Sequence, residues 1–220
     1  DAFAAWNSTE LESYLIEITA DLLGKKDDDG GPLVDKILDS AGQKGTGKWT
    51  AVNALEHGFP LTLITEAVAA RFLSSMKDER VRAAGVLGGP GTRGIGTGRS
   101  AVESPPLGPE ELRKSLLASK IISYTQGFML MRKAAGSYGW DLNFPGISRV
   151  WQGGCIIRSI LLKDMERAFT EGKKDDSLLM DGYFRNLVSD CLPAWRQTVA
   201  AAALGGIPVP AMGSALNFYD

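Results

Sequence analysis

Glycines and lysines cluster at residues 42–49, where the sequence reads G-Q-K-G-T-G-K-W. The glycines and the short Thr46 let backbone amides approach a bound group closely, and Lys44 and Lys48 add positive charge. This combination is suited to binding an anion such as a phosphate. A solvated basic turn without a ligand is the alternative that composition alone leaves open.

Two glycine patterns resemble nucleotide-binding loops without matching their context. Residues 42–49 fit the Walker A pattern except that Trp49 stands where a Ser or Thr hydroxyl would bind Mg²⁺. Residues 89–94 read G-P-G-T-R-G, but neither a hydrophobic strand before them nor a helix after them is indicated. We therefore expect neither a nucleotide hydrolase nor a dinucleotide-binding domain in this chain.

Arg71 shares a helical stripe with Ile64, Ala67 and Val68. A guanidinium on an apolar stripe is costly unless it meets a carboxylate or a bound anion. Glu66, five residues earlier, is poorly placed to face it along a helix. Arg71 is therefore a candidate anion ligand, with a structural ion pair as the alternative.

The scarcity of histidine and cysteine excludes several kinds of catalytic site. The chain has one histidine, His57, and two cysteines, Cys155 and Cys191. Common zinc sites cannot be built from so few ligands, and no G-x-S-x-G motif accompanies His57. We predict no metal site, no catalytic role for His57, and buried thiols in a reducing compartment.

Composition and charge limit the class of protein. The 220 residues are 44% apolar and carry 24 Lys and Arg against 26 Asp and Glu, with a pI of about 5.6. Such a chain can bury a core but offers no global positive field for nucleic acid or an anionic membrane. No uncharged apolar run reaches the roughly 18 residues of a membrane span, and no signal peptide is indicated. We expect a soluble, cytoplasmic protein, with an organelle such as the plastid as the alternative.

Helix signals dominate the first half of the chain. The capping-box pattern T-E-L-E at 9–12 predicts a helix that ends near Gly24. Helical periodicity from Leu61 predicts a second helix to about Glu79. Eight glycines and three prolines then mark 85–108 as a long loop or insertion.

The second half also favours helices. Pro109 followed by two glutamates predicts a helix start, with the helix running to about Lys133. The apolar run at 155–162, introduced by Gly153-Gly154, predicts a helix in the middle of the core, where Arg158 would need a partner. Further helices are expected at 176–190 and 193–204. The predicted fold class is all-α.

Several stretches resemble a known family, in the order that the family has them. The run D-S-A-G-Q-K-G-T-G-K-W-T at 39–50 closely resembles the signature of 6-phosphogluconate dehydrogenase. Further similar stretches are Ser13–Thr19, Glu66–Arg71, Ala118–Tyr124, Trp151–Ser159, Gly206–Pro210 and Ala215–Asp220. Only 85–108 is poorly matched. Collinear motifs of this length are far more specific than a single glycine loop.

The resemblance implies the family's all-helical C-terminal domain, which forms most of a homodimer interface and one wall of the 6-phosphogluconate site. The family oxidises this sugar acid with NADP and decarboxylates it to ribulose 5-phosphate, in the pentose phosphate pathway. Carried over by motif, Lys44 and Thr46 of K-G-T-G-K-W and Arg71 of E-A-V-x-A-R would hold the substrate's phosphate end. We therefore expect residues 1–220 to form one all-helical domain that binds 6-phosphogluconate and dimerises.

The departures from the family pattern shape the remaining expectations. The family's NADP-binding Rossmann domain should precede residue 1, and its catalytic K-x-x-H-N-G-x-E-Y motif has no counterpart here. Its C-terminal tail would follow Asp220, Ala69 replaces the usual Phe, and Gln152 replaces the usual Arg. We assign no catalytic residue, and we predict that these residues alone do not turn over. The alternative is a catalytically inactive helical scaffold or dimerisation module derived from that enzyme.

Overall fold

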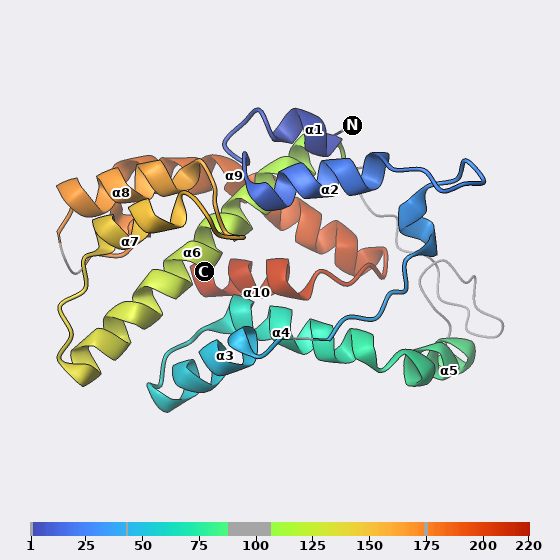
Figure 1. The fold of residues 1–220 in the computed structure, drawn as a ribbon, viewed down its shortest axis with the longest axis horizontal. Helices are drawn as coiled ribbons and strands as arrows, with labels where there is room; N and C mark the ends of the chain where they lie inside the picture. The colour runs from blue at the N-terminus through green and yellow to red at the C-terminus, as the bar shows by residue number, and fades with distance from the viewer. Residues whose placement is uncertain (1, 43, 88–106, 174–175) are drawn as a thin grey trace. The chain divides into compact units, whose positions relative to one another are not determined.

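A computed structural model describes residues 2–42, 44–87, 107–173 and 176–220, and 72% of these described residues are helical. No β-strand occurs in these described ranges, which confirms the predicted all-α class. The elements in chain order (Figure 1) are α1 Ala2–Trp6, α2 Tyr14–Gly24, the 3₁₀ helix η1 Leu33–Lys36, α3 Thr46–Glu56, α4 Thr62–Ser75, α5 Lys77–Leu87, α6 Pro109–Tyr138, α7 Phe144–Trp151, α8 Leu161–Glu171, the 3₁₀ helix η2 Leu178–Met180, α9 Gly182–Leu204 and α10 Pro210–Tyr219.

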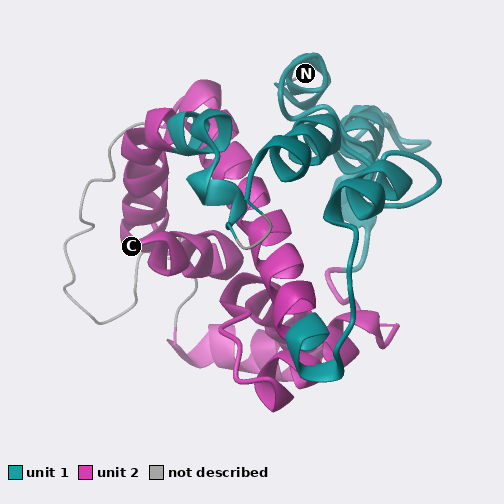
Figure 2. Cartoon of the chain, turned by 90° about the vertical axis from the view of Figure 1, so that its left-hand side faces the viewer, with its two compact units in different colours: residues 1–38, 134–188 teal, residues 39–133, 189–220 magenta. Residues whose placement is uncertain are grey.

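The chain divides into two compact units (Figure 2). Unit 1 comprises residues 1–38 and 134–188, and unit 2 comprises 39–133 and 189–220. Within unit 1, α1 packs on α2 and α7 packs on α8. Within unit 2, α4 packs on both α3 and α10. The long helices α6 and α9 contribute residues to both units.

The core of unit 2 positions α4. The side chain of Gln126 on α6 is fully buried; its Nε2 donates to Thr62 Oγ1 at 2.9 Å, and its Oε1 accepts from the Leu63 amide at 3.1 Å. The first amides of a helix have no intrahelical acceptor, so Gln126 caps α4 from a neighbouring helix. Leu63 is the buried side chain of α4, and Trp195 of α9 is fully buried in the same unit. The start of α4 is thereby fixed.

In unit 1, α8 supplies an apolar face of four buried residues, Leu161, Leu162, Met165 and Ala168. Phe169 of α8 packs against Phe144 of α7, with the ring centroids 5.4 Å apart.

Neither Cys155 nor Cys191, both within the described residues, is in a disulfide. Cys191 is buried, as predicted, whereas Cys155 is partly exposed.

The capping-box prediction at residues 9–12 is wrong. The helix α2 begins at Tyr14, with Ser13 as its N-cap residue. Thr9 instead lies just after the short helix α1, where its hydroxyl donates to the Trp6 carbonyl at 2.7 Å. The unpredicted α1 therefore uses the side chain that was expected to cap α2. Gly24 is the last residue of α2, close to the predicted end.

The segment predicted as one helix from Leu61 to about Glu79 is two helices. The first, α4, ends at Ser75, and α5 begins at Lys77, with Met76 between them at φ −82° and ψ 44°. The side chains of Phe72 and Leu73 are about half exposed, so the predicted apolar stripe is not the buried face at this end of α4.

The predicted helix over the apolar run at 155–162 is also wrong for most of its length. Residues 152–160 form turns and bends, with an isolated β-bridge from Ser159 to Ser13, and α8 begins only at Leu161. Gly154 has a φ of 70°, a left-handed conformation that interrupts a helix. Ile156 is 65% exposed rather than central in the core. Arg158 is partly exposed; its guanidinium donates to Glu17 Oε2 at 2.6 Å and lies over the Tyr14 ring.

The other helix predictions are close to the structure. The helix α6 begins at Pro109 as predicted and continues past Lys133 to Tyr138. The two helices expected between 176 and 204 are the single helix α9, with Pro193 inside it and an end at Leu204.

In the predicted loop at 85–108, residues 85–87 belong to α5, and residues 88–106, including the motif at 89–94, lie outside the described residues.

Candidate functional site

The start of α3 has features that suit an anion. Gly45, the N-cap residue, has a φ of 108°, which strongly favours glycine, and its carbonyl accepts from the Trp49 amide at 2.8 Å. The amides that open a helix have no intrahelical acceptor, and the helix dipole is positive there. The first turn of α3 contains no acidic residue that would neutralise this charge. Lys44 and Thr46 lie exposed at this helix start.

Close packing sets the position of α3 on α4. A Cβ atom built on Gly47 would lie only 2.8 Å from Val68 Cγ2. A contact this short does not occur between ordinary side chains, so glycine is required for the observed approach. The first turn of α3 is therefore held against the middle of α4, which also carries Arg71.

Arg71 contacts the same loop directly. Its Nε donates to the Gly42 carbonyl at 2.9 Å, and its Nη2 donates to the same oxygen. A guanidinium has five N–H donors, so these two bonds leave donors for a further acceptor. Arg71 is exposed and meets a backbone carbonyl, so it does not lie on a buried apolar stripe as the sequence predicts. Its role as an anion ligand stays a prediction.

Sequence reasoning missed three side chains that hold this loop. The hydroxyl of Ser74 accepts from the Ala41 amide at 3.0 Å. Lys77 forms an ion pair with Asp39, and Arg80 donates to the Asp39 carbonyl at 2.8 Å. The Lys77 ammonium and, to a smaller degree, the Arg80 guanidinium hold the pKa of the Asp39 carboxyl below its usual value. The only sequence signal is the three-residue spacing of polar side chains from Arg71 to Arg80.

Lys44, Thr46 and Arg71 thus belong to unit 2, on one loop and the two helices that hold it. Gly42, the acceptor of Arg71, is two residues before Lys44, and Gln43 between them lies outside the described residues. A dianionic phosphate suits this set of groups: the Lys44 ammonium, the Arg71 guanidinium, the Thr46 hydroxyl and the amides of a helix start. The described residues contain no group of three or more His, Cys, Asp or Glu that could hold a metal ion.

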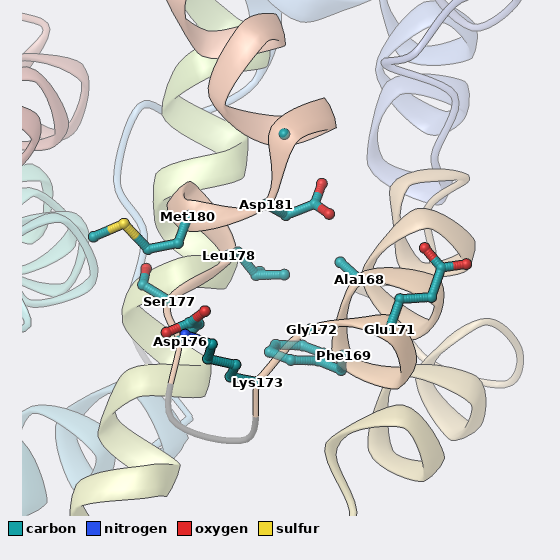
Figure 3. A pocket seen from close by; sticks show the side chains of 11 residues that line it. Ala168, Phe169, Glu171, Gly172, Lys173, Asp176, Ser177, Leu178, Met180 and Asp181 are labelled. Carbon is teal, nitrogen blue, oxygen red and sulfur yellow. The ribbon is translucent and has the colours of Figure 1, made fainter.

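A separate cavity of about 230 Å³ lies in unit 1 (Figure 3). Phe169, Leu178 and Met180 give it apolar walls, and Glu171, Asp176 and Asp181 give it a mostly acidic rim that also includes Lys173. This charge is opposite to what an anionic substrate requires. The cavity includes none of the three predicted site residues.

The architecture is that of an all-α domain with a glycine-lysine loop leading into a helix start. Residues 1–220 match the family model described as the C-terminal domain of 6-phosphogluconate dehydrogenase. The chain therefore belongs to the 6-phosphogluconate dehydrogenase C-terminal domain family, which confirms the resemblance found in the sequence.

Relatives in several organisms share this similarity over the whole chain. The chain is 56% identical over 220 residues to the decarboxylating 6-phosphogluconate dehydrogenase of Schizosaccharomyces pombe and 52% identical over 220 residues to that of Homo sapiens. These alignments cover 100% of this chain but 43% and 44% of the relatives. The chain thus spans less than half the length of the relatives it matches.

A solved structure of Plasmodium falciparum 6-phosphogluconate dehydrogenase is similar in fold, with a TM-score of 0.89 and 37% identity. The match covers 99% of this chain and 46% of the other. That enzyme was solved alone, with its cofactor NADP⁺ and with its substrate 6-phosphogluconate.

Proposed function

We propose that these 220 residues are the substrate-binding and dimerisation part of an NADP-dependent, decarboxylating 6-phosphogluconate dehydrogenase. The reaction would oxidise 6-phosphogluconate and release carbon dioxide to give ribulose 5-phosphate. The observation that carries the proposal is the family match over residues 1–220, together with 51–56% identity to decarboxylating relatives.

The proposed role of the glycine-lysine loop is to hold the phosphate end of the substrate. Lys44 supplies a mobile ammonium, Thr46 a hydroxyl at the helix start, and Arg71 a guanidinium fixed by Gly42. Charge-assisted hydrogen bonds of this kind are about twice as strong as neutral ones, and the helix dipole acts in the same direction. Each of the three groups is exposed, so a ligand has access to them.

NADP would accept the hydride from the sugar acid. The described residues include no strand and hence no βαβ unit to hold a dinucleotide, so we infer that a domain outside these 220 residues binds most of the cofactor. The residues of this chain would bind and orient the phosphate end, and none is assigned a proton-transfer role.

Exposed apolar side chains support the proposed homodimer. Within unit 2, Trp49 is 69% exposed and Leu55 is 76% exposed, and within unit 1 Val150 is 73% exposed. Covering such residues in a partner interface removes apolar area from water. We expect a dimer in sedimentation at micromolar concentration, and a monomer under those conditions would contradict this part of the proposal.

We also propose that residues 1–220 act as one domain in a cytoplasmic enzyme. The family match spans residues 1–220, and α6 and α9 each supply residues to both units. In the described ranges, no helix combines the length and the apolarity needed to cross a bilayer.

The test is turnover of the natural full-length polypeptide with 6-phosphogluconate and NADP, followed by NADPH absorbance and by carbon dioxide release. Its intact mass is measured on the same sample. We expect NADPH and carbon dioxide in equal amounts from the full-length polypeptide, and no turnover from the isolated 220 residues. Full-length protein that binds 6-phosphogluconate without turnover would support the inactive-scaffold alternative instead.

A further inference from the structure

A row of polar side chains on two consecutive helices faces residues 39–42. The row has a strict three-residue spacing and consists of Arg71 and Ser74 on α4 and Lys77 and Arg80 on α5. Residues three apart on a helix lie on nearly the same face. All four side chains contact the segment that leads into the candidate phosphate loop.

The contacts follow an antiparallel order. Arg80 and Lys77 hold Asp39, Ser74 holds Ala41, and Arg71 holds Gly42. As the loop advances from Asp39 toward Lys44, its partners step back along α5 and α4. The partners in each contact are 29 to 41 residues apart in sequence, so the contacts fix the loop on a distant element.

Arg80 joins the loop to the end of α4. Its Nη2 donates to the Asp39 carbonyl at 2.8 Å and to the Ser74 carbonyl at 2.8 Å, and its Nη1 lies 3.2 Å from Asp39 Oδ2. The last carbonyls of a helix lack intrahelical donors, so one guanidinium satisfies the end of α4 and the backbone of the loop. Lys77 adds the second ion pair to Asp39.

Lys44 lies between two anchors. On one side, this row of contacts ends at Gly42, two residues before Lys44. On the other side, Gly47 packs against Val68 at the start of α3. These two sets of contacts therefore determine the position of the Lys44 backbone. Asp39 and its partners Lys77 and Arg80 are not themselves proposed substrate ligands.

We propose that Asp39, through its ion pairs with Lys77 and Arg80, is a positioning residue that sets the affinity of the Lys44–Arg71 site for the phosphate end of the substrate. The inference rests on the proposed function. Exposed ion pairs contribute little to global stability, so the effect of losing this one falls on the placement of the loop. The KM for 6-phosphogluconate and kcat, measured together, then separate positioning from a general structural role.

The test is Asp39→Asn in the natural full-length polypeptide, with Asp29→Asn as the matched control. Asp29 is also an aspartate paired with a lysine, and its side chain is 59% exposed against 58% for Asp39. For Asp39→Asn we expect the KM for 6-phosphogluconate to rise about fivefold, because a displaced loop loses ligand alignment and an exposed ion pair contributes at most about this factor. We expect kcat and the KM for NADP to stay within about twofold of wild type, since the proposed function places the reacting groups and the cofactor away from Asp39.

Inorganic phosphate is the second probe. As a competitive inhibitor that occupies only the phosphate site, it should weaken by the same factor as 6-phosphogluconate in Asp39→Asn. Asp29→Asn should change neither value. Lys77→Gln removes one of the two cations at Asp39 and should raise the KM for 6-phosphogluconate by an intermediate factor of about three. This second variant keeps the test valid if Asp39→Asn does not fold.

The outcomes separate the two proposals. If wild-type protein binds 6-phosphogluconate and both Asp39→Asn and Lys77→Gln match Asp29→Asn, the positioning role is wrong and the proposed function stands. If kcat falls while KM is unchanged, the positioning role is also wrong. Failure of the wild-type protein to bind 6-phosphogluconate would instead overturn the proposed function.

Discussion

Two exposed loops of this chain use the same chemistry to different ends. In the loop at 25–32 and the adjoining η1, Lys36 pairs with Asp27 at 2.8 Å and with Asp29. In the loop at 39–42, Lys77 pairs with Asp39, and Arg80 reinforces the pair. All partners in the first loop lie within nine residues of one another, whereas those in the second are 38 or more residues apart.

The separation of the partners decides what each ion pair does. The first loop is already closed by its own backbone, with the Gly30 amide on the Asp27 carbonyl and the Asp27 amide on the Gly31 carbonyl, both at 2.8 Å. Its ion pairs only support a turn that local bonds define. The second loop has distant partners, so its ion pairs determine where it lies on α4 and α5. Equal exposure and equal chemistry therefore give a local turn in one case and the placement of a candidate site in the other.

The largest expected effect follows from removing the proposed ligands in the second loop. The double variant Lys44→Ala, Arg71→Ala should weaken 6-phosphogluconate binding at least about 100-fold, because two charge-assisted contacts to phosphate are lost. Titration calorimetry on the natural full-length polypeptide measures the change. Lys36→Ala removes a cation from the first loop and should leave the affinity unchanged. Unchanged binding in the double variant would contradict the roles carried over by motif.

The next effect tests the second anchor of the loop through its glycines. Gly47→Ala places a Cβ atom 2.8 Å from Val68 Cγ2 and should lower the free energy of unfolding by about 1–3 kcal/mol. A Cβ on Gly42 meets no atom within 4 Å, so Gly42→Ala should stay within about 0.5 kcal/mol of wild type.

Denaturant unfolding of the 220-residue chain measures both glycine variants. If residues 1–220 are one domain, each curve has a single transition. Equal stability of the two variants would show that α3 moves off α4 without cost, and that the Gly47–Val68 contact does not anchor the loop.

Local rules predicted those helix ends that local chemistry determines. The start of α6 at Pro109 and the end of α9 before Gly205-Gly206 were read correctly, since proline and glycine act there through their own backbone. The prediction of a buried helix at 155–162 is wrong because apolar composition does not show which protein surface covers a side chain. Gly154 at φ 70° and the exposed Ile156 show that these residues leave the helix.

The candidate site divides in the same way. Glycine and lysine spacing alone predicted an anion loop at 42–49, and the family resemblance supplied Lys44, Thr46 and Arg71 as phosphate ligands. The contacts at Asp39 were not predictable, because a lysine 38 residues away is one of many exposed cations in the sequence. Only the fold shows which cation an exposed carboxylate meets.

The smallest expected effect compares the two loops by titration. Hydrogen bonding to Lys36 lowers the pKa of Asp29, and hydrogen bonding to Lys77 and Arg80 lowers that of Asp39, from the ordinary value of 3.8. A lowered folded-state pKa means that each pair stabilises the fold above the unfolded-state value and is lost as pH falls through the folded-state value. Both contributions are therefore fully present at neutral pH and disappear only in acid.

NMR titration of the side-chain carboxyl carbons distinguishes the loops. In Lys77→Gln the midpoint of Asp39 should rise toward 3.8 while that of Asp29 stays in place, and Lys36→Gln should do the reverse. Arg80 should keep the Asp39 midpoint partly lowered in Lys77→Gln, whereas Asp29 in Lys36→Gln retains only backbone donors such as the Gly31 amide. A common midpoint near 3.8 for both aspartates in the wild-type protein would show that neither pair forms in solution, and the distinction between the loops would then rest on backbone contacts alone.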